Sequence, residues 1–248
     1  MEEQVDRLVK KTWESYQNVP PSKRLLIAVS GIPGSGKTTL AAIVSNRLNE
    51  LHAQQSPGTC NGNPLSAFLP MDGYHLSRRQ LDALPDPVSA HARRGAEFTF
   101  DGESFLKLVK KLREPLCPET QTLFAPSFDH ATKDPGKYIS KDPFADDIAI
   151  APSIRIIIFE GNYLSLDKPP WKYAAAMMNE LWFVEVDREV ARNRLIYRHV
   201  RAGIADDEVS AARRADENDL VNGKEIIENR LDVHEIVASK DDDDWKPE

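Results

Sequence analysis

The sequence has few cysteines and no long apolar run. Its 248 residues include only Cys60 and Cys117, whose spacing is not that of a metal-binding motif. Two isolated thiols are typical of a reducing compartment rather than of a disulfide-stabilised secreted protein. No apolar stretch approaches the roughly 20 residues that span a bilayer. The N-terminus, Met-Glu-Glu-Gln-Val-Asp, is acidic where a signal or transit peptide would be basic. We therefore expect a cytoplasmic protein with no membrane partner.

Positive charge is also scarce. The 39 acidic residues outnumber the 32 lysines and arginines, which gives a formal net charge of −7. This balance argues against nucleic acid as a partner. A protein of this composition that handles phosphates must gather its basic residues locally, so any arginine cluster becomes informative.

The most informative motif lies in residues 24–39. Gly31, four intervening residues, and then Gly36, Lys37 and Thr38 match the G-x-x-x-x-G-K-[ST] phosphate-binding loop. Backbone N–H groups of such a loop converge on a phosphate chain, the lysine reaches the β- and γ-phosphates, and the threonine hydroxyl serves Mg²⁺. We expect ATP to contact the loop through Gly31, Pro33, Gly34, Ser35, Gly36, Lys37, Thr38 and Thr39.

A glycine-rich turn without a ligand is the plainer interpretation of this motif. The flanking sequence favours phosphate binding, because an apolar run precedes the loop and apolar residues recur at helical spacing after it. Those residues are Leu40, Val44, Leu48 and Leu51.

Strand-like and helix-like patterns alternate along the chain. This alternation predicts βαβ units and an α/β P-loop NTPase fold, with a mostly parallel central sheet flanked by helices. We expect a single domain over residues 1–240, with an N-terminal helix in 1–21. Residues 190–222 would form an arginine-rich lid helix and a second helix capped by Asp206. Residues 241–248 are expected to be an acidic tail.

Two carboxylates follow predicted strands. Asp72 ends the strand at 65–71, which we expect to neighbour the phosphate-loop strand, and Glu160 ends the very apolar strand at 154–159. Ligand-binding residues of open α/β sheets lie beyond the carboxyl ends of strands. Asp72 is therefore a candidate general base and Glu160 a candidate acid associated with Mg²⁺. A turn aspartate and an ordinary solvated glutamate are the plainer alternatives.

Basic and aromatic residues supply further candidates. Arg194, Arg198 and Arg201 recur at helical spacing and form one stripe, either a solvated face or a lid that neutralises a transferring phosphoryl group. Residues that could hold an acceptor, with packing or loop surface as the alternative, are Tyr74, His75, Arg93, Asp129 and His130.

The ordered series of motifs resembles the uridine kinase, pantothenate kinase and phosphoribulokinase group of P-loop kinases. The segments that carry the resemblance are the loop, Met71-Asp72-Gly73-Tyr74-His75, Phe98-Thr99-Phe100-Asp101, Pro126 to His130, Ile157 to Gly161 and the arginine-rich helix after Asp187. Within the group the chain looks closest to a uridine-kinase-like branch of fungal P-loop proteins and bacterial fructose-transport-associated kinases.

The resemblance implies roles for individual residues. Asp72 would be the catalytic base, Thr38 and Glu160 would serve magnesium, and the helix that carries Arg194 and Arg198 would be the lid. Uridine kinases proper have an Asp-Ser/Asp-Phe-Tyr-type segment where this chain has Asp-Gly-Tyr-His, so the acceptor stays open among nucleosides, sugars and pantothenate-like alcohols.

Two other functions are compatible with a phosphate-binding loop. A GTPase would carry an Asn-Lys-x-Asp guanine-reading segment, which this sequence does not contain. A non-catalytic nucleotide-binding regulator would bind ATP without acceptor-dependent ADP release. The oligomeric state, a homo-oligomer included, stays open.

Overall fold

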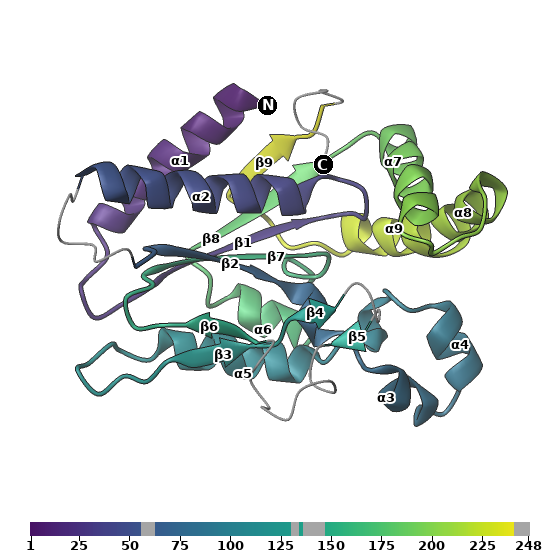
Figure 1. The fold of residues 1–248 in the computed structure, drawn as a ribbon, viewed down its shortest axis with the longest axis horizontal. Helices are drawn as coiled ribbons and strands as arrows, with labels where there is room; N and C mark the ends of the chain where they lie inside the picture. Colours follow the sequence, from purple (N-terminus) through teal and green to yellow (C-terminus); the bar gives the residue numbers. More distant parts are fainter. Residues whose placement is uncertain (56–62, 130–133, 136–146, 241–248) are drawn as a thin grey trace.

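A five-stranded parallel sheet organises the structure (Figure 1), which is a computed structural model that describes residues 1–55, 63–129, 134–135 and 147–240. The strand order is β2-β7-β1-β8-β9, with every pair parallel. The predicted α/β architecture is thus confirmed. The strands are β1 (Leu25–Gly31), β2 (Ser66–Pro70), β7 (Ile156–Gly161), β8 (Glu180–Glu185) and β9 (Glu235–Ala238).

Two of the three inner strands, β1 and β7, are nearly continuous apolar runs because both of their faces are covered. Every residue of β1 and of β7 is buried. Their register pairs Val29 with Glu160 and Ser30 with Gly161. The last residues of β7 therefore lie beside the start of the phosphate loop.

The strand order corrects one expectation. We expected the strand before Asp72 to neighbour the phosphate-loop strand, but β7 lies between β1 and β2. The apolar run of β7 needs a neighbour on each side to pair its backbone, and the inner position supplies both. Glu160, not Asp72, is thus on the strand next to β1.

Helices cover both faces of the sheet (Figure 1). On one face α1 (Glu2–Gln17) and α2 (Lys37–Gln55) pack on Leu25, Ile27 and Val29. On the other face α5 (Gly102–Arg113) and α6 (Trp171–Ala175) pack on the alternate residues of β1. Asp101 caps α5 through a hydrogen bond from the Ser104 N–H.

The predicted lid is a cluster of helices at one end of the sheet. It contains α7 (Arg188–Arg201), α8 (Glu208–Arg214), a π-helical turn η4 (Ala215–Asp219) and α9 (Leu220–Glu228). Asp206 is not the cap of α8. Asp207 is, because Ser210 stands three residues after it and completes a reciprocal capping box.

Short elements complete the described chain. Two-residue and three-residue strands pair antiparallel outside the main sheet: β3 (Leu123–Ala125) with β6 (Ile148–Ile150), and β4 (Phe128–Asp129) with β5 (Asp134–Pro135). The turn η1 (Met71–Tyr74) follows β2, then come α3 (Arg78–Asp82), α4 (Pro87–Ala92) and η2 (Glu97–Thr99). No helix in the described residues has the length and apolar character needed to cross a membrane.

We predict that Ile158→Ala destabilises the protein by about 2–5 kcal/mol, because the side chain on β7 is fully buried and its removal leaves a cavity. Ile236→Ala on the edge strand β9, where the side chain is half exposed, should cost less than about 1 kcal/mol. Urea unfolding of both variants checks this. Equal losses would contradict the central position of β7.

Candidate active site

The phosphate loop is held open by two glycines. Gly34 and Gly36 have φ angles of 81° and 85°, a backbone region that residues with a side chain rarely adopt. A Cβ on Gly34 would also lie 2.7 Å from the carbonyl oxygen of Ala191 in α7. The loop leads directly into α2, so backbone N–H groups at the start of that helix are available to an anion.

Lys37 and Glu160 form a buried ion pair below the loop. The Lys37 Nζ and a Glu160 carboxylate oxygen are 3.7 Å apart, and the same Nζ lies 3.4 Å from the Ile32 carbonyl oxygen. Burial lowers the pKa of Lys37 and raises the pKa of Glu160. The Thr38 hydroxyl also donates a hydrogen bond to Glu160, which opposes the rise in that pKa. The long separation leaves both charged groups able to serve a ligand.

Asp72, in η1, adds a second carboxylate to the charged residues near the loop. Its carboxylate is about half exposed, with 47% of the side chain accessible. Its negative charge raises the pKa of both Lys37 and Glu160, although burial remains the larger effect on each. The described structure therefore brings Lys37, Thr38, Asp72 and Glu160 together at the carboxyl edge of the sheet.

The two aromatic candidates after Asp72 have different surroundings. Tyr74 is buried against the edge of the Phe105 ring, and burial raises the pKa of its hydroxyl. The His75 Nδ1 lies 2.9 Å from the Asp72 carbonyl oxygen and 3.8 Å from a carboxylate oxygen of the same residue. His75 also packs on the ring of Phe100, and burial lowers the pKa of its imidazole.

The lid arginines differ from one another. The Arg194 guanidinium donates to the Gly34 carbonyl oxygen, to the Ser239 hydroxyl and to the Lys240 carbonyl oxygen, so it ties the loop to the segment after β9. The positive charge of Arg198 lowers the pKa of both Lys37 and Glu160. Arg201 is exposed at the end of α7.

One further lid arginine, Arg192, makes a two-pronged ion pair with Asp216, at 2.7 and 2.8 Å. This pair joins α7 to η4.

Arg93, Asn218 and Asn222 form a polar wall where η4 and α9 pack on the segment after α4. The Arg93 guanidinium donates to the Asn222 side-chain oxygen at 2.6 Å, and the Asn218 amide donates to the Arg94 carbonyl oxygen. The next residue, Gly223, packs on Ile32 of the loop so closely that a Cβ would lie 3.3 Å from it. Sequence reasoning found Arg93 but missed both asparagines.

Asn218 and Asn222 are almost fully buried, yet asparagine disfavours the interior of helices. This unusual placement of asparagine in a helical segment was the sequence signal that could have identified both residues. Of the remaining predicted acceptor residues, Asp129 contributes its backbone to β4 and His130 lies outside the described residues.

Oxygen donors at the site suit magnesium. The Glu160 carboxylate and the Thr38 hydroxyl are hard oxygen ligands next to each other. Within the described residues no group of three His, Cys, Asp or Glu side chains is placed to hold a metal ion. A magnesium ion would therefore take further ligands from a bound phosphate chain and water, which is its usual behaviour.

Comparison with known proteins identifies the family. No protein-family model matches the chain. It is 56% identical over 167 residues to the ATP-dependent kinase-like protein notR' of Aspergillus versicolor, covering 67% of this chain and 92% of that protein. It is 41% identical over 218 residues to C227.14 of Schizosaccharomyces pombe, whose uridine kinase designation is provisional, covering 88% and 84%. The chain belongs to the uridine-kinase-like P-loop kinases.

Solved structures agree with this family. A Silicibacter kinase assigned provisionally to a fructose transport system superposes with a TM-score of 0.74 at 31% identity, over 94% of this chain and 98% of that one. YFH7 of Saccharomyces cerevisiae, a P-loop protein with a circular permutation, shares the fold with a TM-score of 0.78 at 24% identity, over 97% and 99%.

We predict that His75 titrates below its ordinary pKa of about 6.5 in the folded protein, because burial disfavours the imidazolium. As pH falls below about 6.5, the unfolded chain takes up this proton and the folded chain does not, so stability falls until pH reaches the lowered pKa. His75→Gln should remove this part of the pH dependence of unfolding. NMR titration of the ring checks the sign, and a midpoint at or above 6.5 would contradict it.

Proposed function

We propose that the protein transfers the γ-phosphoryl group of ATP to a hydroxyl of a nucleoside, a sugar or a similar small metabolite. The observation that supports this best is the grouping of Lys37, Glu160 and Asp72, whose charges act on one another at the mouth of the phosphate loop. Relatives named as ATP-dependent kinases support the same chemistry.

In this proposal each residue at the loop has one task. Lys37 and the loop N–H groups hold the β- and γ-phosphates. Glu160 and Thr38 would hold magnesium, which would neutralise charge on the phosphates. Asp72 takes the proton from the acceptor hydroxyl as that oxygen bonds to the γ-phosphorus. The bond from that phosphorus to the β–γ bridging oxygen breaks, and ADP leaves with this oxygen. The exposed face of the Asp72 carboxylate gives the acceptor access to it.

The lid arginines Arg198 and Arg194 have different roles in this proposal. Arg198 supplies positive charge that acts on the loop, which suits it to the transferring phosphoryl group. Arg194 holds the loop against the segment that follows β9 through its three hydrogen bonds. Closing the lid would exclude water, which otherwise competes as the acceptor.

The acceptor would lie between η1 and the polar wall. His75 borders Asp72 on one side, and Arg93 with Asn222 lies on the other, next to the loop. The buried side-chain oxygen of Asn218 and the Nε of Arg93 have no hydrogen-bond partner in the described residues. Such groups favour a ligand rich in hydroxyls, which donates and accepts. Tyr74, Asp129 and His130 stay predictions for this site.

A screen of ADP release over hydroxyl-bearing metabolites tests the function. With the acceptor found, Asp72→Asn should lower turnover by roughly 10²–10⁴-fold and keep nucleotide affinity, because it removes a general base without touching the loop. Lys37→Ala should lose both turnover and affinity. Asp82→Asn, an exposed aspartate on α3, is the matched control and should behave as wild type.

Two results would contradict the proposal. Near-normal turnover of Asp72→Asn on the acceptor would remove Asp72 as the base. Tight ATP binding with no acceptor-dependent ADP release across the screen would favour the non-catalytic regulator instead.

A further inference from the structure

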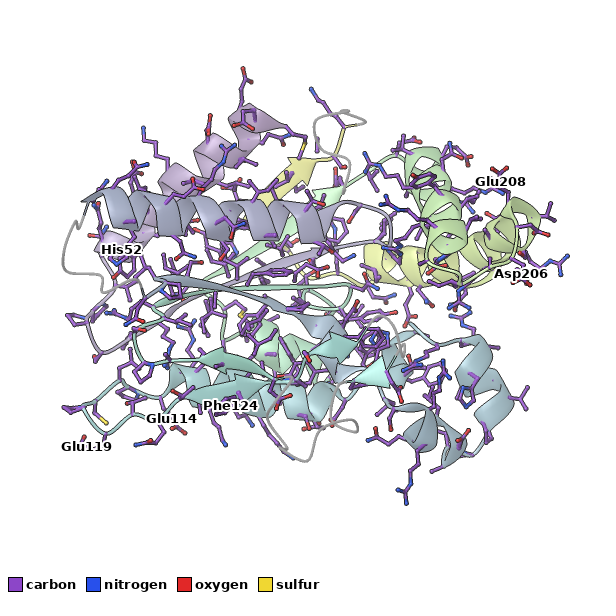
Figure 2. All side chains as sticks on the ribbon, viewed as in Figure 1. His52, Glu114, Glu119, Phe124, Asp206 and Glu208 are labelled. Carbon is purple, nitrogen blue, oxygen red and sulfur yellow. The ribbon has the colours of Figure 1, made fainter. Side chains whose placement is uncertain are left out.

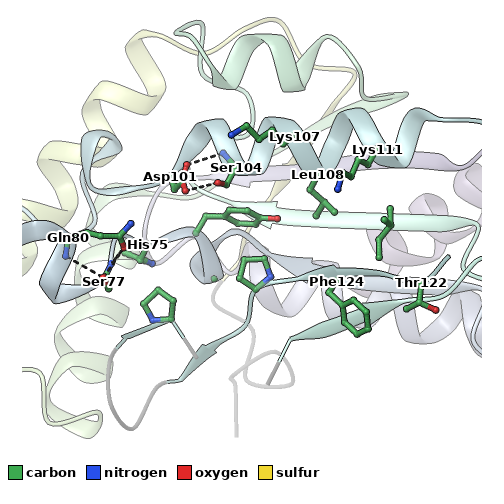
Figure 3. A pocket seen from close by; sticks show the side chains of 15 residues that line it. His75, Ser77, Gln80, Asp101, Ser104, Lys107, Leu108, Lys111, Thr122 and Phe124 are labelled. Carbon is green, nitrogen blue, oxygen red and sulfur yellow. Dashed lines mark hydrogen bonds between the residues drawn. The ribbon is translucent and has the colours of Figure 1, made fainter. Parts of the chain in front are cut away.

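A cavity of about 580 Å³ lies between η1, α5 and β3 (Figure 3). No residue of the phosphate loop lines it, and neither Asp72 nor Glu160 does. Its volume is in the range of small-molecule sites. Tyr74 and His75, which are candidates for the acceptor site, line one side of the cavity, and the rest of its lining has no task in the proposed phosphoryl transfer.

One edge of the cavity carries unpaired positive charge. Asp101, Ser104, Lys107 and Lys111 recur every three or four residues, so they share one face of α5. The Asp101 carboxylate is already occupied, because it accepts hydrogen bonds from the Ser104 N–H at 2.9 Å and the Ser104 hydroxyl at 2.6 Å. Neither lysine forms an ion pair within the described residues. Two lysines one turn apart, with no acidic partner in the part of the chain that the structure describes, concentrate positive charge in a protein of net charge −7.

The opposite edge is apolar. Phe124 and Thr122 stand on the β3 side, across the cavity from Lys107 and Lys111 (Figure 3). Leu108 and Leu123 line the space between, and the Phe124 side chain is 40% exposed. The cavity thus combines an aromatic and aliphatic surface with two ammonium groups.

We propose that this cavity binds a small organic anion, separately from ATP. Its carboxylate or phosphate would lie against Lys107 and Lys111, and its apolar or aromatic body against Leu108, Leu123 and Phe124. An ammonium group is a point charge that accepts either kind of anion, so the lining specifies charge rather than one acidic group. The site stands whether or not the chain proves to be a kinase.

The cavity shares a wall with the segment that carries Asp72. Gly73, Tyr74 and His75 line it, and these three residues directly follow Asp72 in η1 and its C-terminal cap. The backbone of Gly73 packs on the Pro126 carbonyl oxygen so closely that a Cβ would lie 1.8 Å from it. The turn therefore cannot move closer to Pro126, and a ligand in the cavity would restrain η1 further.

Fluorescence titration with 8-anilinonaphthalene-1-sulfonate, an aromatic anion, tests the site. Wild type should bind one equivalent saturably, and saturating ATP should not displace it. Lys107→Gln/Lys111→Gln should weaken binding by at least about 10-fold, because both cations are lost. Lys110→Gln, on the same helix outside the cavity lining, should bind as wild type. Competition by benzoate and by phenyl phosphate then separates carboxylate from phosphate ligands.

Three results would overturn the proposal: no saturable binding, unchanged affinity in the double variant, or displacement of the probe by ATP. The substituted lysines are exposed, so the variants should keep the wild-type urea midpoint, and this is measured alongside. The probe binds independently of turnover. A failed phosphoryl-transfer screen would therefore leave this result intact, and the reverse also holds.

Discussion

The burial of Lys37 beside Glu160 is the constraint on which the rest of the structure depends. Each charge alone would cost several kcal/mol to remove from water, so the two must be placed together. The parallel register of β1 and β7 does this by ending β7 next to the phosphate loop. At 3.7 Å the pair is too far apart for a strong hydrogen bond, and burial lowers the pKa of the lysine and raises that of the acid. A triphosphate with its metal would supply each of them with a partner.

The surrounding elements protect this pair and control what reaches it. Gly34 allows α7 to approach the loop, and Arg194 holds the loop to the end of β9. The ion pair between Arg192 and Asp216 gives the lid cluster its own internal support, independent of any nucleotide. The positive charge of Arg198 acts on both buried groups and lowers the pKa of each. Within the arginine stripe, Arg194 thus holds the loop, Arg198 is the residue that we propose for catalysis, and Arg201 is exposed.

Sequence reasoning was reliable where the signal is local. The loop motif, the buried runs of β1 and β7 and the acid near the end of β7 are all short-range patterns, and the structure contains them. Strand order was not readable, because periodicity says which residues form a strand but not which strand lies beside it. The polar wall was missed for a similar reason. Asn218 and Asn222 become meaningful only when η4 and α9 pack against Arg93, which is far away in the chain.

The dependence of ATP affinity on magnesium tests the central claim most directly. Calorimetric titrations of ATP with and without Mg²⁺ should show a gain of at least about 10-fold in affinity for wild type, and almost none for Glu160→Gln. Glu185→Gln, which changes an exposed acid at the end of β8, on the far side of β1 from β7, should keep the full gain. If Glu160→Gln also keeps the full gain, Glu160 does not hold the metal and the account of the buried pair is wrong.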